Sequence, residues 1–436
     1  MIQEEEILVL REVSVPGGKV TDITLSGGYV IHTGGSGRAD REIRCQGHVV
    51  IPAGIDMHVH MRDGAQSQKE DWETGTRSAL AGGVTVVVDQ PNTIPPLTSP
   101  CLIRDRIRLA ERQAWCRFAI NGGVTSDADI PGMWQAGAMA FGEAFAGPSS
   151  YGEAVTPAIL SRAMEQVSER RSLLTIHAED VSAGPDWDIN AHDRLRPVNG
   201  EVKAVTEVLN LNIPGCRLHF CHLSSASAIR TVNADPVSGS VEVTPHHLFL
   251  SREMFREDNA FGKVNPPLRS ETERRSLVSE WNQIDVIASD HAPHAIQEKG
   301  NSFGDAPSGI PGVETMIPLL MAWVAEHRVC LAEVVRKTSE NPARILGIEP
   351  AGFVPGCRAD FAVFPEKVSV VDPDLLHSKA GWTPYEGMPA IFPEIVILGG
   401  EVVFDQGEYV HPGAGVRSPD HRLWLPGRGY TKGEPI

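Results

Sequence analysis

IPAGIDMHVHMRD, residues 51–63, is a short apolar run that ends in two histidines, His58 and His60. Side chains alternate across a β-strand, so residues two apart point to the same face and two imidazoles can converge on one metal ion. A histidine can also be an ordinary polar partner in a protein core. Further histidines and carboxylates at the ends of other strands would favour the metal site.

The length and charge of the chain limit the functional classes to which the protein can belong. It has 436 residues, with 39 lysines and arginines against 56 aspartates and glutamates, for a net charge of −17. Without a dense basic block, the chain lacks the electrostatic footprint of a protein that binds nucleic acid or anionic membranes. No apolar run reaches the roughly 18 residues of a membrane helix, and the acidic start MIQEEEILVL is unlike a secretory signal. These features predict a cytoplasmic protein that acts on a small molecule.

The cysteines predict reduced thiols. There are seven, none in a C-x-x-C pair, and the odd number argues against a disulfide framework. Cys221 precedes His222 and could be considered a nucleophile, but the two lie on opposite faces of a predicted strand. Buried cysteine usually behaves as a small hydrophobe, and we expect this of Cys221.

The middle of the chain repeats one unit, an apolar β-rich run that ends in polar residues and precedes a helix-compatible stretch. The eight runs are VVIPAGIDMHVH, GVTVVVDQPNT, CRFAINGGV, GAMAFGEAF, LLTIHAED, RLHFCHLSS, SVEVTPHHL and IDVIASDHAPH. Between them, WETGTRSALAG, LIRDRIRLAERQ, PAILSRAMEQVSERR, SASAIRTV and ETERRSLVSEW are predicted helices. Eight such units predict an α/β fold with a (β/α)8 TIM-type barrel over residues 51–350. An open doubly wound sheet would need a Gly-rich phosphate loop after its first strand, which the sequence lacks.

The two ends of the chain predict a second, smaller domain. EILVLREVSV and VTDITLSGGYVIHTG near the start resemble FVPGCRADFAVF and AIFPEIVILGGEVVFDQGEYV near the end, and all predict short strands. We expect residues 1–50 and 351–436 to form one small β-sandwich domain. The last twenty or so residues, rich in Gly, Pro and charge, predict a surface tail.

Polar residues stand at the carboxyl ends of five of the eight runs, where barrel enzymes gather their chemistry. They are His58 and His60, then Glu143, His177, His222 and Asp290. Four histidines and two carboxylates offer enough donors for two divalent cations. Each residue alone could be a core histidine or a helix cap. Six such coincidences at the same end of the repeat favour a metal site.

The motifs of the chain resemble those of dihydroorotases, in the cyclic amidohydrolase group of the amidohydrolase superfamily. They are DMHVHMRD, KEDWETGTRSALAGGVT, QPNT, IHAED, CHLSS, TPHHL, NPPLR, SDHAPH, SGIPGVET and SKAGWTPYEGM, and they span essentially the whole chain. The resemblance implies a reversible, metal-dependent interconversion of N-carbamoyl-L-aspartate and L-dihydroorotate in pyrimidine synthesis.

The resemblance also assigns the metal ligands. His58, His60 and Asp290 are implied for one ion, and His177 and His222 for a second. Zinc is the implied metal, two ions per chain, although manganese or cobalt would suit the same ligands. Asp290 is also implied as the catalytic base and then acid, which takes a proton from the nucleophile and delivers it to the ring nitrogen.

The bridging ligand departs from the commonest family pattern. Many relatives carry a carboxylated lysine in a segment like AGLKLY, and the matching AGAMAF here has Met139 at that position. Another branch has an aspartate in a segment like AFSDDG, and the matching AFGEAF has Glu143. Glutamate is an anionic oxygen donor that can bridge two cations, so we predict this role for Glu143. The alternative is a solvated carboxylate on the following loop, which would leave one metal or a weakly occupied second site.

The substrate contacts are implied in the same way. Arg62 matches a residue that binds the substrate carboxylate, for which a planar guanidinium suits better than a lysine. The further implied contacts are Asn92 and His294 for that carboxylate, Asn265 for the ring, and the main chain near Gly309 in a loop over the mouth, residues 301–312. For Asn92 and Asn265 a turn-forming role is the alternative, because each adjoins prolines or turn residues.

Two other functions compete with this one. A sister cyclic amidase, allantoinase or hydantoinase, would lack the combination of Arg62, Asn92 and His294. An inactive homologue that only scaffolds aspartate transcarbamoylase would have lost ligand histidines, and all four are present. The resemblance further suggests a homodimer and a possible association with aspartate transcarbamoylase.

Overall fold

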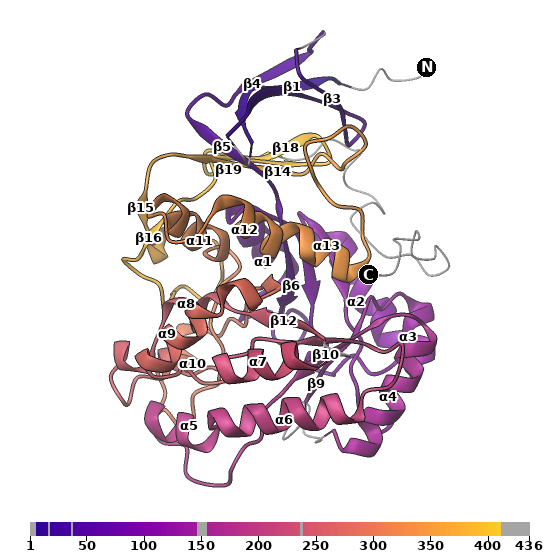
Figure 1. Ribbon diagram of the computed structural model, residues 1–436, viewed down its shortest axis with the longest axis vertical. Coiled ribbons are helices and arrows are strands. Elements are labelled where there is room, and N and C mark those ends of the chain that lie inside the picture. The colour runs from indigo at the N-terminus through magenta and orange to yellow at the C-terminus, as the bar shows by residue number, and fades with distance from the viewer. Residues whose placement is uncertain (1–5, 16–17, 36–37, 146–154, 236–238, 411–436) are drawn as a thin grey trace.

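The computed structural model describes residues 6–15, 18–35, 38–145, 155–235 and 239–410. A sheet built from both ends of the chain lies at one end of the molecule, and parallel strands with helices around them make up the remainder (Figure 1). The predicted α/β class with parallel strands is confirmed. The predicted surface tail lies outside the described residues.

Eight parallel strands follow the eight predicted runs. They are β6 (Gly54–Val59), β7 (Val84–Asp89), β8 (Arg117–Ile120), β9 (Phe141–Phe145), β10 (Leu173–His177), β11 (Arg217–Phe220), β12 (Ser240–Val243) and β13 (Val286–Ile287). They form a three-stranded sheet, β6-β7-β8, and a five-stranded sheet, β13-β12-β11-β10-β9. Isolated parallel bridges, Val59 with His291 and Gly122 with Phe141, link the two sheets on both sides. The first bridge joins the carboxyl end of β6 to the segment that follows β13, and the second joins the segment that follows β8 to the beginning of β9.

Helices occupy the connections between these strands. The five predicted ones are α1 (Trp72–Ala81), α2 (Pro100–Gln113), α4 (Pro157–Glu169), α7 (Ala226–Ala234) and α9 (Glu271–Ser279). The helices that the sequence pattern does not predict are α3 (Ile130–Ala136), α5 (Ile189–Leu195), α6 (Val198–Leu211), α8 (Pro245–Phe249), α10 (Ile296–Lys299), α11 (Met316–Ala325), α12 (Leu331–Val335) and α13 (Asn341–Leu346). In α2, the buried residues Ile103, Arg106, Ile107 and Ala110 follow the three- and four-residue spacing of one helix face.

The sheet at the chain ends has nine strands. They are β1 (Leu8–Ser14), β2 (Val20–Ser26), β3 (Tyr29–Thr33), β4 (Arg41–Arg44), β5 (His48–Pro52), β14 (Phe361–Pro365), β17 (Ile395–Leu398), β18 (Glu401–Asp405) and β19 (Glu408–Tyr409). β5 and β14 pair antiparallel and so join the beginning of the chain to its end. The first predicted run is divided, because its residues 49–52 belong to β5 and its histidines follow in and after β6. This sheet therefore fixes the point at which β6 begins.

A buried carboxylate ties this sheet to the parallel strands. Asp360, fully buried, precedes β14 and accepts hydrogen bonds from Arg117 of β8 at 2.5 Å and from Arg358 at 3.0 Å. The main-chain nitrogen of Gly399 donates to its other oxygen at 2.7 Å. Burial opposes ionisation, but the two arginines outweigh it and hold the pKa of Asp360 below its usual value. The two parts of the molecule are thus joined by an ion pair with little access to water.

The structure also bears on the state of the cysteines and on the presence of membrane helices. All seven cysteines are free thiols, and burial raises the pKa of Cys221 to about 12, as expected of a small buried hydrophobe. Across the described ranges of the chain, no helix has the length and apolar character needed to cross a membrane.

Candidate metal centre

The structure brings all six predicted metal ligands together. His58 lies in β6, Glu143 in β9 and His177 at the end of β10, while His60, His222 and Asp290 stand one to three residues beyond β6, β11 and β13. All six are buried, none more than 6% exposed. Because parallel strands end at a common edge, ligands far apart in the sequence meet there.

Three of the predicted site residues, each just beyond the end of a strand, have unusual backbone angles. Arg62 (φ 47°), His222 (φ 36°) and Asp290 (φ 45°) have left-handed conformations, although none is glycine. Each such residue costs on the order of 1–3 kcal/mol, and this strain gathers at functional sites. In this protein the backbone strain lies at residues whose side chains are predicted to bind metal or substrate.

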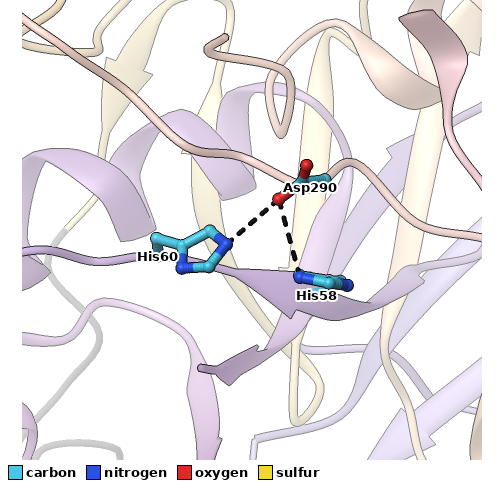
Figure 2. Close-up of side chains that lie close together, drawn as sticks. All are labelled: His58, His60 and Asp290. Carbon is cyan, nitrogen blue, oxygen red and sulfur yellow. Dashed lines mark hydrogen bonds and ion pairs between the residues drawn. The ribbon is translucent and has the colours of Figure 1, made fainter. Parts of the chain in front are cut away.

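His58, His60 and Asp290 form the first group of ligands, which Figure 2 shows with both imidazoles directed toward one carboxylate oxygen. Oδ1 of Asp290 lies 3.0 Å from Nε2 of His60 and 3.5 Å from Nε2 of His58. One donor atom from each residue falls within 4.8 Å of the others. The main-chain nitrogen of His60 donates to His291 at 2.8 Å, which fixes the two segments relative to each other.

Glu143 stands between this group and the second one. Its Oε1 lies 2.8 Å from Nδ1 of His177 and 2.5 Å from Nε2 of His222, while its Oε2 lies 3.6 Å from Nε2 of His58. Each oxygen thus faces a different group of histidines, as a bridging ligand requires. Glu143 lies within β9 rather than on the following loop, and Met139 is buried in an apolar cluster.

Three of the histidines direct their other ring nitrogen toward an acceptor. The pairs are His58 Nδ1 with Oε1 of Glu242 at 3.1 Å, His60 Nδ1 with Oδ1 of Asn92 at 2.6 Å, and His177 Nε2 with Oε2 of Glu179 at 2.9 Å. Acceptors of this kind hold metal-binding histidines in one tautomer and orientation. The nitrogens that face the centre are therefore the ones that would bind a cation.

The electrostatics of the centre fit a bound cation. Nε2 of His58 is buried and has no hydrogen-bond partner among the described residues, although two carboxylates lie within 3.6 Å. Burial opposes protonation, yet Glu242 and the other carboxylates raise the pKa of His58 well above its usual value. Burial also opposes ionisation of Glu143, but His58 and His222 hold its pKa well below its usual range. Buried negative charge here is balanced by protons on imidazoles, which a metal ion replaces when it binds.

Four of the five predicted substrate contacts lie in one connected chain. NH2 of Arg62 lies 3.2 Å from Nε2 of His294, and that nitrogen lies 3.0 Å from the main-chain oxygen of Ser308. The hydroxyl of Ser308 donates to Asn265 at 3.3 Å, and Gly309 follows it in the sequence. Burial lowers the pKa of Arg62 to about 10, which leaves the guanidinium charged at neutral pH. The fifth residue, Asn92, lies instead against His60.

Gly309 occupies a position that only glycine fits. Its φ is +132°, and a Cβ there would stand 2.6 Å from the main-chain oxygen of Ala292. Its N–H donates to the main-chain oxygen of Lys263 at 3.0 Å, and its carbonyl accepts from Nζ of Lys299 at 3.1 Å. A carbonyl has two lone pairs, so this oxygen can accept a second bond from a ligand.

Comparison with known proteins places the chain in a family. Residues 49–382 match the Amidohydrolase family. The chain belongs to the amidohydrolase family. Two relatives carry the name that the motifs suggested, dihydroorotase, and come from Methanosarcina acetivorans and Methanosarcina mazei. Each is 38% identical to this chain, and the alignments cover 94% and 93% of this chain and 93% of each relative.

Solved amidohydrolase structures show the same fold. An L-hydantoinase (dihydropyrimidinase) from Arthrobacter aurescens has a TM-score of 0.85 at 24% identity, covering 93% of this chain and 98% of that one. This likeness concerns the fold alone. Together with the ligand groups above, membership of the family identifies the protein as a metal-dependent hydrolase.

Two residues of this amidohydrolase centre were missed from the sequence. Glu242 contacts both His58 and His219, and Glu179 contacts His177 and lies 3.6 Å from Arg196. A glutamate in the middle of the short apolar strand SVEV is itself a signal, since unpaired buried carboxylates are rare. Glu179 stands two residues after His177, in the motif IHAED.

Proposed function

We propose that this amidohydrolase is a dihydroorotase, which interconverts N-carbamoyl-L-aspartate and L-dihydroorotate in pyrimidine synthesis. The observation that carries the proposal is the pair of Arg62 and His294 beside the metal-ligand cluster. Metal ligands alone suit any cyclic amidase, but dihydroorotate carries a ring carboxylate that hydantoin and allantoin lack. A buried guanidinium is a well-suited partner for that group. The names of the archaeal relatives support the same substrate.

The residues of the centre would hold two divalent cations, for which we propose zinc. His58, His60 and Asp290 would bind one, His177 and His222 the other, and Glu143 would be shared. When bound, the ions would lower the pKa of a water molecule toward neutrality and polarise the ring carbonyl. Imidazole and carboxylate donors suit zinc, and manganese or cobalt would fit the same set.

Asp290 is the proposed acid and base. Burial opposes its ionisation, but His58 and His60 outweigh that effect and lower the pKa of Asp290, so that it is a carboxylate at neutral pH. It can therefore accept a proton from the attacking water and then deliver it to the departing ring nitrogen. In the direction of ring closure, the same carboxylate would take the proton from the attacking nitrogen.

The substrate would be oriented by the connected residues beside Asp290. Arg62, His294 and Asn92 would hold the ring carboxylate, and Asn265 and the main chain at Gly309 would hold the ring. Holding the carbonyl carbon at a fixed place beside the nucleophile supplies much of the rate of such a reaction.

We also propose a finer description of the fold and its setting. The bridges on both sides of the parallel sheets support one closed (β/α)8 barrel over residues 51–350. The pairing of β5 with β14 supports a domain built from residues 1–50 and 351–436. That its strands pack as a sandwich remains our prediction. A cytoplasmic homodimer, with possible association with aspartate transcarbamoylase, remains our prediction from the motifs.

The decisive experiment compares three substrates. We expect zinc-loaded protein to hydrolyse dihydroorotate and to leave hydantoin and allantoin unchanged. The hydrolysis is measured as the loss of the ultraviolet absorbance of dihydroorotate. Replacing Arg62 by methionine should lower kcat/KM for dihydroorotate by about tenfold to a hundredfold, as expected for a lost charged hydrogen bond. Turnover of hydantoin or allantoin instead would identify a sister amidase. Metal-loaded protein with no turnover of any of the three would identify an inactive homologue.

A further inference from the structure

Lys69 is a cation beside the proposed carboxylate site, and the roles described above do not include it. It stands before α1 in the KEDW segment, and its side chain is 14% exposed. Its Nζ lies 3.1 Å from Nδ1 of His294 and 3.0 Å from Oε1 of Glu298 in α10. Lys69 therefore links the segment that leads into α1 with the segment that follows β13.

The contacts with Lys69 and with the Ser308 carbonyl together indicate where His294 carries its proton. The Lys69 ammonium faces Nδ1 and the Arg62 guanidinium faces Nε2, and both groups have only hydrogen-bond donors, whereas a neutral imidazole has one acceptor nitrogen. The main-chain oxygen of Ser308, which can only accept, also faces Nε2, so Nε2 is the donor and Nδ1 accepts from Lys69. The proton of the neutral ring then lies on Nε2, which donates to the main-chain oxygen of Ser308 at 3.0 Å. Burial first, and then the charges of Arg62, Lys69 and Lys299, lower the pKa of His294 far below its ordinary value. These contacts describe a neutral imidazole that is protonated at Nε2.

Without the ammonium, the surroundings would favour the opposite tautomer. Oε2 of Glu298 lies 3.8 Å from Nδ1 of His294 and would attract a proton to that nitrogen. NH2 of Arg62 lies 3.2 Å from Nε2 and would donate to it once it had lost its proton. That bond would occupy the guanidinium that is proposed to bind the substrate carboxylate.

The other lysine near His294, Lys299, is already bonded elsewhere. Nζ of Lys299 lies 3.0–3.1 Å from the main-chain oxygens of Lys263, Pro307 and Gly309. It therefore holds the loop that carries Gly309 and does not replace Lys69 at the imidazole.

We propose that Lys69 is a positioning residue that locks His294 in its neutral Nε2–H tautomer. In this state the single N–H of His294 donates to the Ser308 carbonyl, and the ring offers no acceptor nitrogen to the Arg62 guanidinium 3.2 Å away, which stays available to the substrate carboxylate. The assignment of the tautomer is independent of the reaction, whereas its effect on carboxylate binding rests on the proposed function.

The first test observes the tautomer in protein without substrate. Nitrogen NMR of protein labelled at histidine distinguishes the two tautomers, and the His294 signal is identified by its loss in His294→Asn. We expect the Nε2–H form in the unaltered protein and in Lys69→Arg, which keeps a cationic donor, and the Nδ1–H form in Lys69→Met. The control is Lys203→Met, which removes a lysine that pairs with Asp180 on the surface and should change nothing. An unchanged His294 tautomer in Lys69→Met overturns the proposal.

The second test separates binding from chemistry. In Lys69→Met we expect KM for dihydroorotate to rise about tenfold, because the guanidinium becomes engaged by His294, while kcat changes less than KM. Lys69→Arg should recover most of the loss. A fall in kcat with an unchanged KM would contradict the positioning role. If the unaltered protein does not turn over dihydroorotate, the proposed function fails, and the NMR result still decides the role of Lys69. If Lys69→Met does not fold, Lys69→Leu replaces it, and an unchanged KM in that variant would also overturn the proposal.

Discussion

Glu143 is a carboxylate that faces both halves of the proposed metal centre, and its replacement by glutamine is the sharpest test of that centre. The amide has nearly the same shape and keeps one oxygen, so packing in β9 should change little. What it removes is a negative charge that now lies 2.5–3.6 Å from three imidazole nitrogens. The variant therefore reports on charge rather than on volume.

The expected size of the effect follows from that geometry. Two unit charges 4 Å apart attract each other by about 4 kcal/mol at the effective permittivity of roughly 20 that suits partly hydrated protein sites. A loss of about 4 kcal/mol corresponds to nearly a thousandfold in affinity. The ion held by His177 and His222 has the fewest other ligands and should be lost first. The ion held by His58, His60 and Asp290 should remain, more weakly bound.

Elemental analysis after dialysis, together with turnover of dihydroorotate, measures this loss. We expect two zinc equivalents for the unaltered protein and one for Glu143→Gln, with kcat lower by about a thousandfold. Glu179→Gln is the matched control, since it removes a buried carboxylate from the other nitrogen of His177. Loss of such an outer partner typically costs 10- to 100-fold, so this variant should keep both ions. Two equivalents and full rate in Glu143→Gln, or equal losses in both variants, would refute the bridging role.

Two further substitutions test the frame around the centre. Gly309→Ala places a Cβ 2.6 Å from the main-chain oxygen of Ala292, so the loop that carries Gly309 must shift. We expect kcat/KM for dihydroorotate to fall at least about tenfold. An unchanged kcat/KM would show that the main chain at Gly309 does not contact the substrate. Asp360→Asn should lower the free energy of unfolding by about 3–5 kcal/mol at pH 7, measured by urea denaturation, because it leaves two arginines without their shared carboxylate. The pKa of Asp360 is lower in the folded state than in the unfolded chain, so this stability is complete above about pH 4 and is lost as the pH falls through the folded pKa. The difference in the free energy of unfolding between the unaltered protein and Asp360→Asn should therefore shrink only below about pH 4. A difference under 1 kcal/mol at pH 7 would contradict the stabilising role of the ion pair.

The strands and the convergence of the six candidate ligands could be predicted because their signals are local. Each parallel strand lies within an apolar run bounded by polar or turn residues, and topology then brings the ends of those runs to one edge. His58 and His177 lie 119 positions apart in the chain, but each follows the same pattern of an apolar run that ends in a ligand. A repeated local pattern is thus enough to predict a shared site.

The missed helices had patterns that did not look helical. α11, MIPLLMAWVA, is apolar on every side and has eight of its ten residues buried, so it shows no contrast between faces. In α6 the buried face includes a charged residue, Glu201, which accepts hydrogen bonds from Ser224 and Ser225. The partners that make both helices favourable come from other parts of the chain, and a single window of sequence does not contain them.

The outer partners of the histidines were missed for a related reason. Glu242 and His58 are 184 positions apart, and their contact exists only because β12 and β6 both reach the centre. A glutamate in a buried strand indicates that a partner exists, but only the arrangement of the strands shows which residue it is. Sequence reasoning therefore finds groups that end their strands at the site more readily than groups that support them from within.

The position of the bridging anion can be argued from the environments of the two candidates on the fourth parallel segment. Met139 packs in an apolar cluster with Ile55, Met57 and Ile345 of α13, where the ammonium of a lysine would be buried among hydrocarbon side chains. Glu143 meets the opposite environment, because imidazole nitrogens converge on both of its oxygens. A carboxylate is stable there only if protons or cations balance it, and an anion at position 139 would find neither. We therefore expect the charge that joins the two halves of the centre to come from Glu143.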